Sequence, residues 1–201
     1  MTENKTQRHQ KRMKRQKSVV DEQIQHADKD KGLLLCITGN GKGKSSSGFG
    51  MVARALGHNM RVGIVQFIKG ACSTGEETFF RRFPDEVEYH VMGDGFTWDT
   101  QNLEQDIASA EAGWEVCKRL LSDPTIDVVL LDELNIVLKM KYLDIDTIIA
   151  DLANRPDMQH VIITGRGAPD AIIEVADTVS RIDDVKHAFR AGIQAQKGIE
   201  L

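Results

Sequence analysis

Short runs of apolar residues alternate along this chain with longer stretches in which apolar residues recur at helical spacing. Several runs are apolar at consecutive positions, as in Val128-Val129-Leu130-Leu131, which is typical of parallel strands covered by helices on both faces. We therefore expect one doubly wound α/β domain with a mostly parallel sheet. The predicted strands are residues 33–38, 61–67, 87–92, 126–132, 160–164 and 177–182.

The longest helical stretch precedes the predicted strand at 126–132. Its apolar residues form one stripe, which predicts a helix with a single face in the core. Trp114 belongs to that stripe, so we expect it in the core and not at a ligand. The helix should end at Asp123, because the residue before a proline disfavours helical geometry. The stripe consists of Leu103, Ile107, Ala110, Trp114, Cys117 and Leu121.

The N-terminal segment has a composition of its own. We expect residues 1–30 to form a basic arm, either flexible or a helix ordered by a partner, and residues 31–201 to form the α/β domain. Segments rich in positive charge also bind nucleic acids. No aromatic residue lies among these charges to stack on bases, so nucleic acid is not the expected partner. Residues 1–20 contain one acid, Glu3, and seven basic residues: Lys5, Arg8, Lys11, Arg12, Lys14, Arg15 and Lys17.

The overall composition is that of an ordinary globular chain, with 41% hydrophobic and 28% charged residues and a net charge of −4. No apolar run is long enough for a membrane-spanning helix, and the N-terminus lacks the apolar segment of a secretory signal. Cys36, Cys72 and Cys117 are isolated and odd in number, which argues against a disulfide framework or a zinc site. We expect a cytoplasmic protein with no membrane partner.

A glycine-rich loop directly follows the first predicted strand. Glycines let the backbone curl so that successive N–H groups face an anion, and the following helix adds the positive end of its dipole. Lys42 and Lys44 add positive charge, and the hydroxyl of Ser45 suits a Mg²⁺ ion bound to phosphates. The loop predicts a triphosphate site for ATP, formed by Gly39, Asn40, Gly41, Lys42, Gly43, Lys44, Ser45 and Ser46.

One detail of this loop departs from the common pattern. That pattern has a glycine five residues before the Gly-Lys pair, and this chain has Thr38 there. The nearest glycine is Gly39, so the loop is one residue shorter. We expect a tight polyphosphate site whose nucleotide pose differs from that of a motor ATPase. The helix that follows should bury Phe49, Val52, Ala53 and Leu56.

Two acids, Asp132 and Glu133, end the predicted strand at 126–132. Acids at the carboxyl end of a parallel strand face the same crevice as the phosphate loop. Because Mg²⁺ prefers carboxylate and phosphate oxygens, we expect a metal site made by Ser45 together with one of these acids. The alternative is that Asp132 only caps the helix that follows it.

Two arginines are candidates for contact with the nucleotide. Arg166 lies between Gly165 and Gly167 after the predicted strand at 160–164, where it would reach a phosphate or a ribose, or tie down its own loop. Arg54 lies within the helix that follows the phosphate loop. Together with the loop and the acids, these positions predict a single α/β domain of the P-loop nucleotide-binding (RecA-like) type.

Several blocks of this sequence resemble the P-loop type of ATP:corrinoid adenosyltransferase. The match runs in order from about residue 30 to the C-terminus. One departure is Ser45-Ser46, where the family usually has threonines, and a serine hydroxyl can serve the same ligand role. The matching blocks are residues 38–44, 65–70, 95–102, 131–134, 163–167 and 185–189.

The resemblance implies transfer of the 5′-deoxyadenosyl group of ATP to the Co(I) of a reduced corrinoid. The products would be adenosylcobalamin, or adenosylated precursors, and triphosphate. It also implies Mg²⁺ or Mn²⁺, a reduced flavoprotein as electron donor, a homodimer, and a nucleotide held in a reversed sense on the loop. Lys42 and Lys44 would stabilise the departing triphosphate, while Phe96 and Trp98 would form an apolar wall on the lower face of the corrin.

Two other functions use the same kind of loop. A small-molecule or nucleotide kinase would transfer the γ-phosphoryl group, and a nucleic-acid-associated ATPase would act through the basic arm. The chain lacks an arginine-rich lid for the first and a second basic surface for the second. It also shows no nucleophile beside a base, which suits a substrate that brings its own Co(I) nucleophile. The phosphate product separates the three functions.

Overall fold

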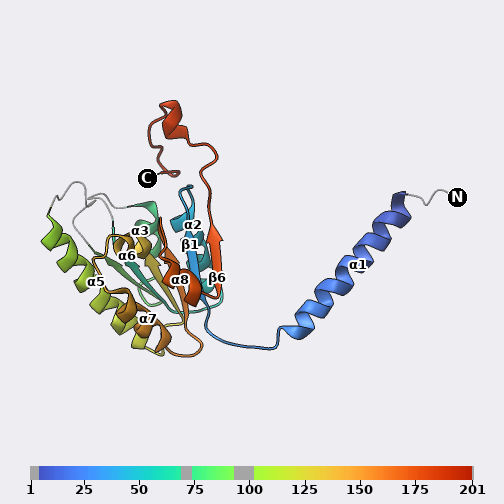
Figure 1. Cartoon of the computed structure of the whole chain (residues 1–201), viewed down its shortest axis with the longest axis horizontal. Coiled ribbons are helices and arrows are strands. Elements are labelled where there is room, and N and C mark those ends of the chain that lie inside the picture. The colour runs from blue at the N-terminus through green and yellow to red at the C-terminus, as the bar shows by residue number, and fades with distance from the viewer. Residues whose placement is uncertain (1–4, 69–73, 93–101, 201) are drawn as a thin grey trace. The chain divides into compact units, whose positions relative to one another are not determined.

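The computed structural model describes residues 5–68, 74–92 and 102–200, and the chain divides into two units (Figure 1). The first unit, Met1–Lys31, contains helix α1, Lys5–His26, whose residues are all exposed. The second unit, Gly32–Leu201, contains the sheet and its helices. Phe96 and Trp98 lie outside the described residues, so their predicted place beside a corrin stays a prediction.

A six-stranded sheet forms the centre of the second unit, with the strand order β3-β2-β4-β5-β1-β6. Every strand pair is parallel, so the predicted parallel α/β fold is confirmed. Each predicted strand is present, and its ends differ from the prediction by no more than two residues. The strands are β1 Leu34–Thr38, β2 Val62–Gln66, β3 Val87–Val91, β4 Val128–Asp132, β5 His160–Thr164 and β6 Thr178–Arg181.

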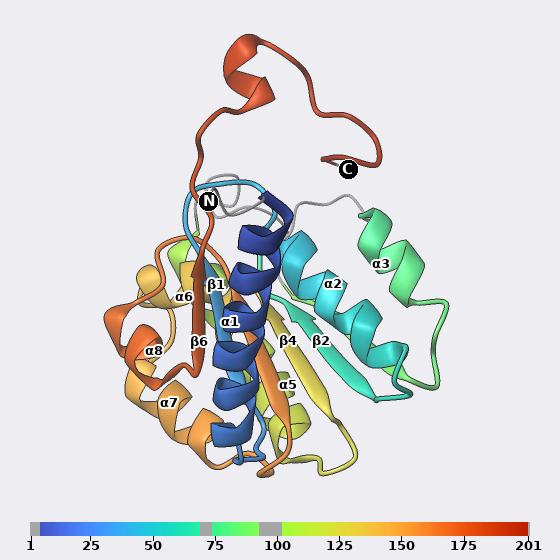
Figure 2. The ribbon, with the colours of Figure 1, turned by 90° about the vertical axis from the view of Figure 1, so that its right-hand side faces the viewer.

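Helices cover both faces of this sheet, as a doubly wound fold requires (Figure 2). On one face lie α2 Lys44–Leu56 and α3 Gly75–Phe80. On the other face lie α5 Leu103–Ser122, α6 Leu134–Lys139, α7 Ile145–Ala153 and α8 Asp170–Val175. A short 3₁₀ helix, Ala188–Ala191, lies in the C-terminal segment.

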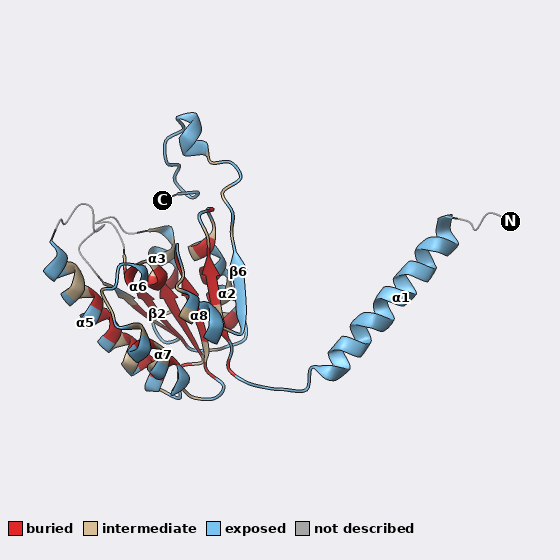
Figure 3. Cartoon of the chain, in the orientation of Figure 1, coloured by how far each residue is buried: buried red, intermediate tan, exposed pale blue. Residues whose placement is uncertain are grey.

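Two apolar cores fill the spaces between the sheet and its helices (Figure 3). Successive strand residues point to opposite faces, so Ile64 packs toward α2 and Val65 packs toward α5. Gly48 lets α2 lie close to the sheet, because a Cβ atom at this position would come within 2.9 Å of the Leu130 side chain. This close packing fixes the start of α2, and with it the glycine-rich loop.

The stripe predicted for the longest helix is confirmed in its middle and at its C-terminal end. Ala110, Trp114, Cys117 and Leu121 are buried in α5, whereas Leu103 at its start is 61% exposed. Trp114 is therefore a core residue, as expected.

The stripe predicted for α2 is wrong at one position. Phe49 and Val52 are buried as expected, but Ala53 is exposed and Ala55 is buried in its place. A residue next to Val52 in the sequence is turned by roughly 100° around the helix axis, which takes Ala53 away from the sheet. Leu56 is half-buried.

Within the described ranges, no helix combines the length and the apolar character that crossing a membrane requires. Cys36 and Cys117 are free thiols, and both lie in the core between the sheet and α5. Burial raises the pKa of both thiols, so neither is activated as a nucleophile.

A buried amide joins α5 to the edge of the sheet that lies opposite the strands' carboxyl ends. Gln159, next to the start of β5, is 2% exposed. Its Nε2 donates to the carbonyl oxygens of Leu120 at 3.1 Å, Asp123 at 3.2 Å and Ile126 at 2.9 Å. One side chain thus adds a donor at the end of α5 and in the connection to β4, where the Leu120 and Asp123 carbonyls also accept from backbone N–H groups.

We expect Gln159→Leu to lower the free energy of unfolding by about 1–3 kcal/mol, because the Ile126 carbonyl loses its side-chain donor and the Leu120 and Asp123 carbonyls keep only their backbone donors. Urea denaturation followed by circular dichroism measures this change. Met158→Leu is the control, since this neighbouring side chain is 52% exposed and should change stability by less than about 0.5 kcal/mol. Similar losses in both variants would contradict the role of the amide.

Candidate active site

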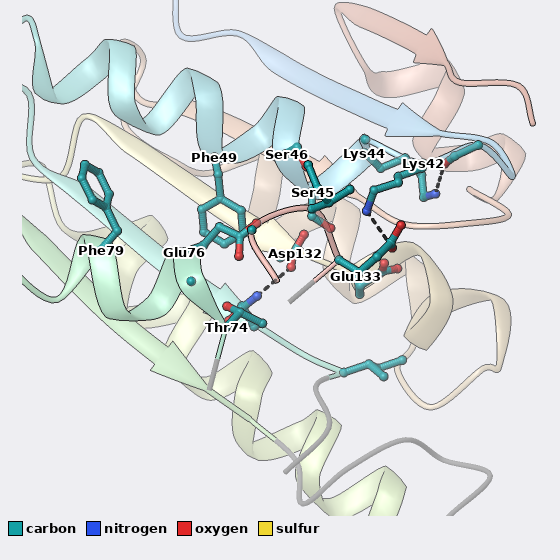
Figure 4. Close-up of a pocket in the computed structure, with 18 of the residues that line it drawn as sticks. Lys42, Lys44, Ser45, Ser46, Phe49, Thr74, Glu76, Phe79, Asp132 and Glu133 are labelled. Carbon is teal, nitrogen blue, oxygen red and sulfur yellow. Dashed lines mark hydrogen bonds and ion pairs between the residues drawn. The ribbon is translucent and has the colours of Figure 1, made fainter. Parts of the chain in front are cut away.

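A pocket of about 680 Å³ opens at the carboxyl edge of the sheet. Its wall is formed by the loop after β1 with the start of α2, the ends of β2 and β4, Arg166 after β5, α3 and the C-terminal segment. Figure 4 shows most of the residues that line it. Open parallel sheets bind their ligands outside the carboxyl ends of their strands, so this pocket is the candidate active site.

The three glycines of the loop are required for two different reasons. Gly43 has a left-handed backbone, with φ of 112°, which other residues rarely adopt. Gly39 and Gly41 lie against the chain that follows β6: a Cβ atom would come within 2.3 Å of the Ile182 carbonyl oxygen at Gly39, and within 2.5 Å of the Asp183 carbonyl oxygen at Gly41. The Gly41 N–H also donates to the Ile182 oxygen at 2.8 Å.

Helix α2 begins at the pocket without a side-chain cap. Gly43 is its N-cap residue, and Lys44 is its first residue. The first backbone N–H groups of a helix have no partner within the helix, and the helix dipole places partial positive charge at the same end. The start of this 13-residue helix therefore presents donors and positive charge to the pocket, which is suited to an anion such as a phosphate.

Lys44 is the buried cation of the loop. It is 6% exposed, and its Nζ donates to the Gly41 carbonyl at 2.7 Å. Burial lowers the pKa of Lys44, while the negative charge of Glu133 opposes this effect. Figure 4 shows these two side chains beside each other. An anion bound here would favour the charged form of Lys44 in the same way.

Asp132 ends β4 and is 3% exposed. Its Oδ2 accepts a hydrogen bond from Gln66 Nε2 at 2.9 Å, and its Oδ1 accepts one from Thr164 Oγ1 at 2.7 Å. Both carboxylate oxygens are therefore already engaged by neighbouring strands. The alternative that Asp132 caps the next helix is wrong, because the N-cap residue of α6 is Glu133.

Glu133 is held differently from the acid before it. Its backbone is left-handed, with φ of 63°, and its side chain makes no capping hydrogen bond to α6. The Oε2 atom is buried without a hydrogen-bond partner. Burial, reinforced by Asp132, raises the pKa of Glu133 to about 7 against the opposing charges of Lys44 and Arg166. A buried carboxylate oxygen without a donor is suited to a cation.

The pocket brings together most of the residues proposed from the sequence. Gly39 and Asn40 do not line it, and Arg54 is exposed on α2 away from its wall. Arg166 lines it and lies close enough to Lys44 and Glu133 to affect the pKa of both. The candidates on the wall are Gly41, Lys42, Gly43, Lys44, Ser45, Ser46, Asp132, Glu133 and Arg166.

Sequence reasoning missed three parts of the wall, namely α3 with Thr74 before it, Gln66 and the C-terminal segment. Gln66 ends β2 beside Asp132, but the pairing of β2 with β4 could not be read from the sequence. The C-terminal segment also reaches the pocket, where Lys42 Nζ donates to Glu200 Oε2 at 2.9 Å. No motif marks Glu200, so only its place in the fold reveals this contact.

The fold and the pocket define an α/β protein whose architecture is consistent with a P-loop domain. Comparison with known proteins makes the class specific, because a family model described as ATP:corrinoid adenosyltransferase BtuR/CobO/CobP matches residues 30–201. The chain belongs to the ATP:corrinoid adenosyltransferase family. This confirms the resemblance found in the sequence.

Relatives named as corrinoid adenosyltransferases match this chain over almost their whole length. The corrinoid adenosyltransferase of Pseudomonas aeruginosa is 64% identical over 197 residues, covering 98% of this chain and 97% of the relative. The corrinoid adenosyltransferase of Escherichia coli K12 and the corrinoid adenosyltransferase CobA of Salmonella typhimurium are each 47% identical over 193 residues, covering 96% of this chain and 97% of each relative. The prediction of a transferase is confirmed.

The ion pair between Lys42 and Glu200 gives a test of the pocket's charge balance. A bound triphosphate would compete with Glu200 for Lys42, so we expect Glu200→Gln to tighten the binding of inorganic tripolyphosphate about two- to fivefold, the range of an exposed ion pair. Isothermal titration calorimetry measures this affinity. Glu174→Gln, at an exposed position outside the pocket wall, is the control. Weaker binding by Glu200→Gln would mean that Glu200 supports the anion site.

Proposed function

We propose that the pocket at the carboxyl edge of the sheet is where this chain carries out the reaction of its family. As an ATP:corrinoid adenosyltransferase, it transfers the 5′-deoxyadenosyl group of ATP to the Co(I) of a reduced corrinoid and releases triphosphate. The observation that carries the proposal is the convergence of Lys42, Lys44 and Arg166 with the uncapped start of α2 on one pocket wall. Such a wall matches the charge of a triphosphate.

The chemical task of this wall is to stabilise a leaving group. Co(I) is itself the nucleophile that attacks C5′, so the protein needs no activated side chain at the reacting carbon. As the bond from C5′ to oxygen breaks, negative charge grows on the triphosphate. Preformed donors and cations placed at that charge lower the barrier, and Lys42, Lys44 and the amides of the α2 start fill this role. The pocket would also hold C5′ of ATP close to the cobalt and in the right orientation for attack.

We propose Mg²⁺ or Mn²⁺ as the metal, held by Ser45 and Glu133. The fit is supported by Glu133 Oε2, which is buried without a partner, and by Ser45 on the same pocket wall. In the described residues, no group of three or more His, Cys, Asp or Glu side chains is arranged to hold a metal alone, so phosphate oxygens would complete the site. When bound, the metal would neutralise charge on the triphosphate.

The homodimer, the flavoprotein and the nucleotide pose in the remaining proposal rest on the family resemblance, whereas the location and the role of the arm rest on composition and charge. We propose that the chain works in the cytoplasm as a homodimer and receives electrons from a reduced flavoprotein. The basic residues of the arm at 1–30 would face the acidic periphery of the corrinoid or the negative surface of that flavoprotein. The nucleotide would lie in a reversed sense on the shortened loop, with its phosphates at Lys42 and Lys44.

One assay tests the proposed function. The protein is mixed with ATP, Mg²⁺ and chemically reduced cobalamin, and both products are followed. A light-sensitive alkylcobalamin spectrum together with tripolyphosphate is the expected result. Release of ADP with phosphate, or of ADP with a phosphorylated acceptor, would instead indicate an ATPase or a kinase.

We expect Lys44→Ala to lower kcat by at least about 10- to 100-fold, because a charge-assisted hydrogen bond to the triphosphate is lost. The chain should still fold, and thermal unfolding checks this. Lys118→Ala is the control, since Lys118 lies on α5 and pairs with Glu115 away from the pocket. Turnover of Lys44→Ala within threefold of the unaltered protein would remove this lysine from the mechanism.

Phe96 and Trp98 are proposed to form an apolar wall on the lower face of the corrin. An apolar wall makes an axial water costly to bury, which leaves cobalt four-coordinate and easier to reduce. We expect Phe96→Ala and Trp98→Ala to slow turnover from Co(II) with a flavoprotein reductant much more than turnover from chemically supplied Co(I). Equal losses in the two assays would mean that the aromatic pair only positions the substrate or supports the fold.

A further inference from the structure

A row of polar side chains crosses the sheet at the edge of the pocket. Tyr89 on β3, Gln66 on β2, Asp132 on β4 and Thr164 on β5 lie on strands that are neighbours in the order β3-β2-β4-β5. Gln66 is paired directly with Asp132 in the strand register. Two residues before Gln66, Ile64 belongs to the apolar core beneath α2. The row is thus the boundary between that core and the pocket.

Hydrogen bonds join this row from end to end. The Tyr89 hydroxyl donates to Gln66 Oε1 at 2.6 Å, and Gln66 Nε2 donates to Asp132 Oδ2 at 2.9 Å. From the other side, Thr164 Oγ1 donates to Asp132 Oδ1 at 2.7 Å. All four side chains are buried, with exposures of 7% or less. The carboxylate of Asp132 is therefore fixed from both neighbouring strands.

The direction of these bonds is determined by chemistry. An ionised carboxylate only accepts hydrogen bonds, so Gln66 must turn its NH₂ group toward Asp132 and its oxygen toward Tyr89. The Tyr89 hydroxyl must then donate. Burial, together with the charge of Asp132, raises the pKa of Tyr89, so this hydroxyl keeps its proton. Tyr89 thereby locks the orientation of the Gln66 amide.

The row also separates the two acids at the end of β4. Thr164 Oγ1 accepts a hydrogen bond from the Glu133 N–H at 3.0 Å while it donates to Asp132. Asp132 thus has a donor on each oxygen, whereas Glu133 Oε2 is buried with none. Asp132 and Glu133 are adjacent carboxylates. They differ in hydrogen bonding because Gln66 and Thr164, on the neighbouring strands, donate to Asp132 alone.

We propose that Gln66, oriented by Tyr89, is a positioning residue for adenosyl transfer, which holds Asp132 in place and leaves Glu133 as the acid that meets the metal–triphosphate complex. This inference rests on the proposed function of the pocket. Without the locked amide, only Thr164 would hold Asp132, and the Oδ2 side of its carboxylate could turn toward the bound cation and compete with Glu133. The arrangement of ligands around the metal would then vary between molecules, and the triphosphate would lose its fixed position.

Tyr89→Phe is the sharpest test, because it removes only the hydroxyl that orients Gln66. The ring itself stays in place through its stack with Phe49, whose centroid is 6.3 Å away. Tyr142→Phe is the matched control, since Tyr142 is the other tyrosine of the chain and does not line the pocket. Gln66→Met, which removes both ends of the link at similar length, is a second variant.

Binding of Mn²⁺ to the protein–ATP complex, without corrinoid and therefore without turnover, is measured by electron paramagnetic resonance. We expect Tyr89→Phe to raise the Kd for Mn²⁺ about five- to tenfold, as the loss of one buried hydrogen bond suggests, and Gln66→Met to raise it further. With Co(I) supplied, kcat should fall by a similar factor while the KM for the corrinoid stays unchanged. Metal-free binding of tripolyphosphate should also stay unchanged, as should every value for Tyr142→Phe.

An unchanged Kd for Mn²⁺ in Tyr89→Phe would overturn the inference, even if kcat fell, because the row would then only support the fold. An equal loss of metal-free tripolyphosphate binding would overturn it too, since the effect would lie on the whole pocket. Failure of the proposed function is distinguishable from both results. It would appear as an unaltered protein that releases no tripolyphosphate from ATP and reduced cobalamin.

Discussion

The site depends on keeping the carboxylate of Asp132 buried among strands. A carboxylate without donors in such a place would cost several kcal/mol or take up a proton. The donors come from Gln66 and Thr164, at the ends of the two strands that flank β4. Strand order and site chemistry are therefore linked, because β4 lies between β2 and β5 and each of these strands supplies a donor to one oxygen of Asp132.

The charges around the pocket explain why a cation should enter together with the nucleotide. Lys42, Lys44 and Arg166 attract a triphosphate, but Asp132 and Glu133 lie on the same wall and repel it. Within a partly buried pocket this repulsion is strong, because little water screens it. A divalent ion held by Ser45 and Glu133 would offset this repulsion. The raised pKa of Glu133 fits this balance, since a nearby cation would favour its ionised form.

Local signals in the sequence predicted the strands, the glycine loop and the acids, because each depends on a few consecutive residues. The consecutive apolar residues of β4 and the loop from Gly39 to Ser46 are signals of this kind. The roles of Gln66 and Glu200 depend on which segments meet in space. No short sequence pattern predicts the strand order or the path of the C-terminal segment. No local pattern marks the left-handed backbone of Glu133 either, whose N–H donates to Thr164 Oγ1 on the neighbouring strand.

The fold also explains why the glycine loop is one residue short. Thr38, at the position where other phosphate loops have glycine, accepts a hydrogen bond through its Oγ1 from the Ala168 N–H at 3.2 Å. Its carbonyl accepts another from the Ile182 N–H at 2.8 Å. A glycine here would lose the first bond, which ties the end of β1 to the loop that carries Arg166. The glycine is needed one residue later, because at Gly39 a side chain would collide with the Ile182 carbonyl. The shortened loop thus follows from packing between β1 and the chain after β6, and the shape of the phosphate site follows from that packing.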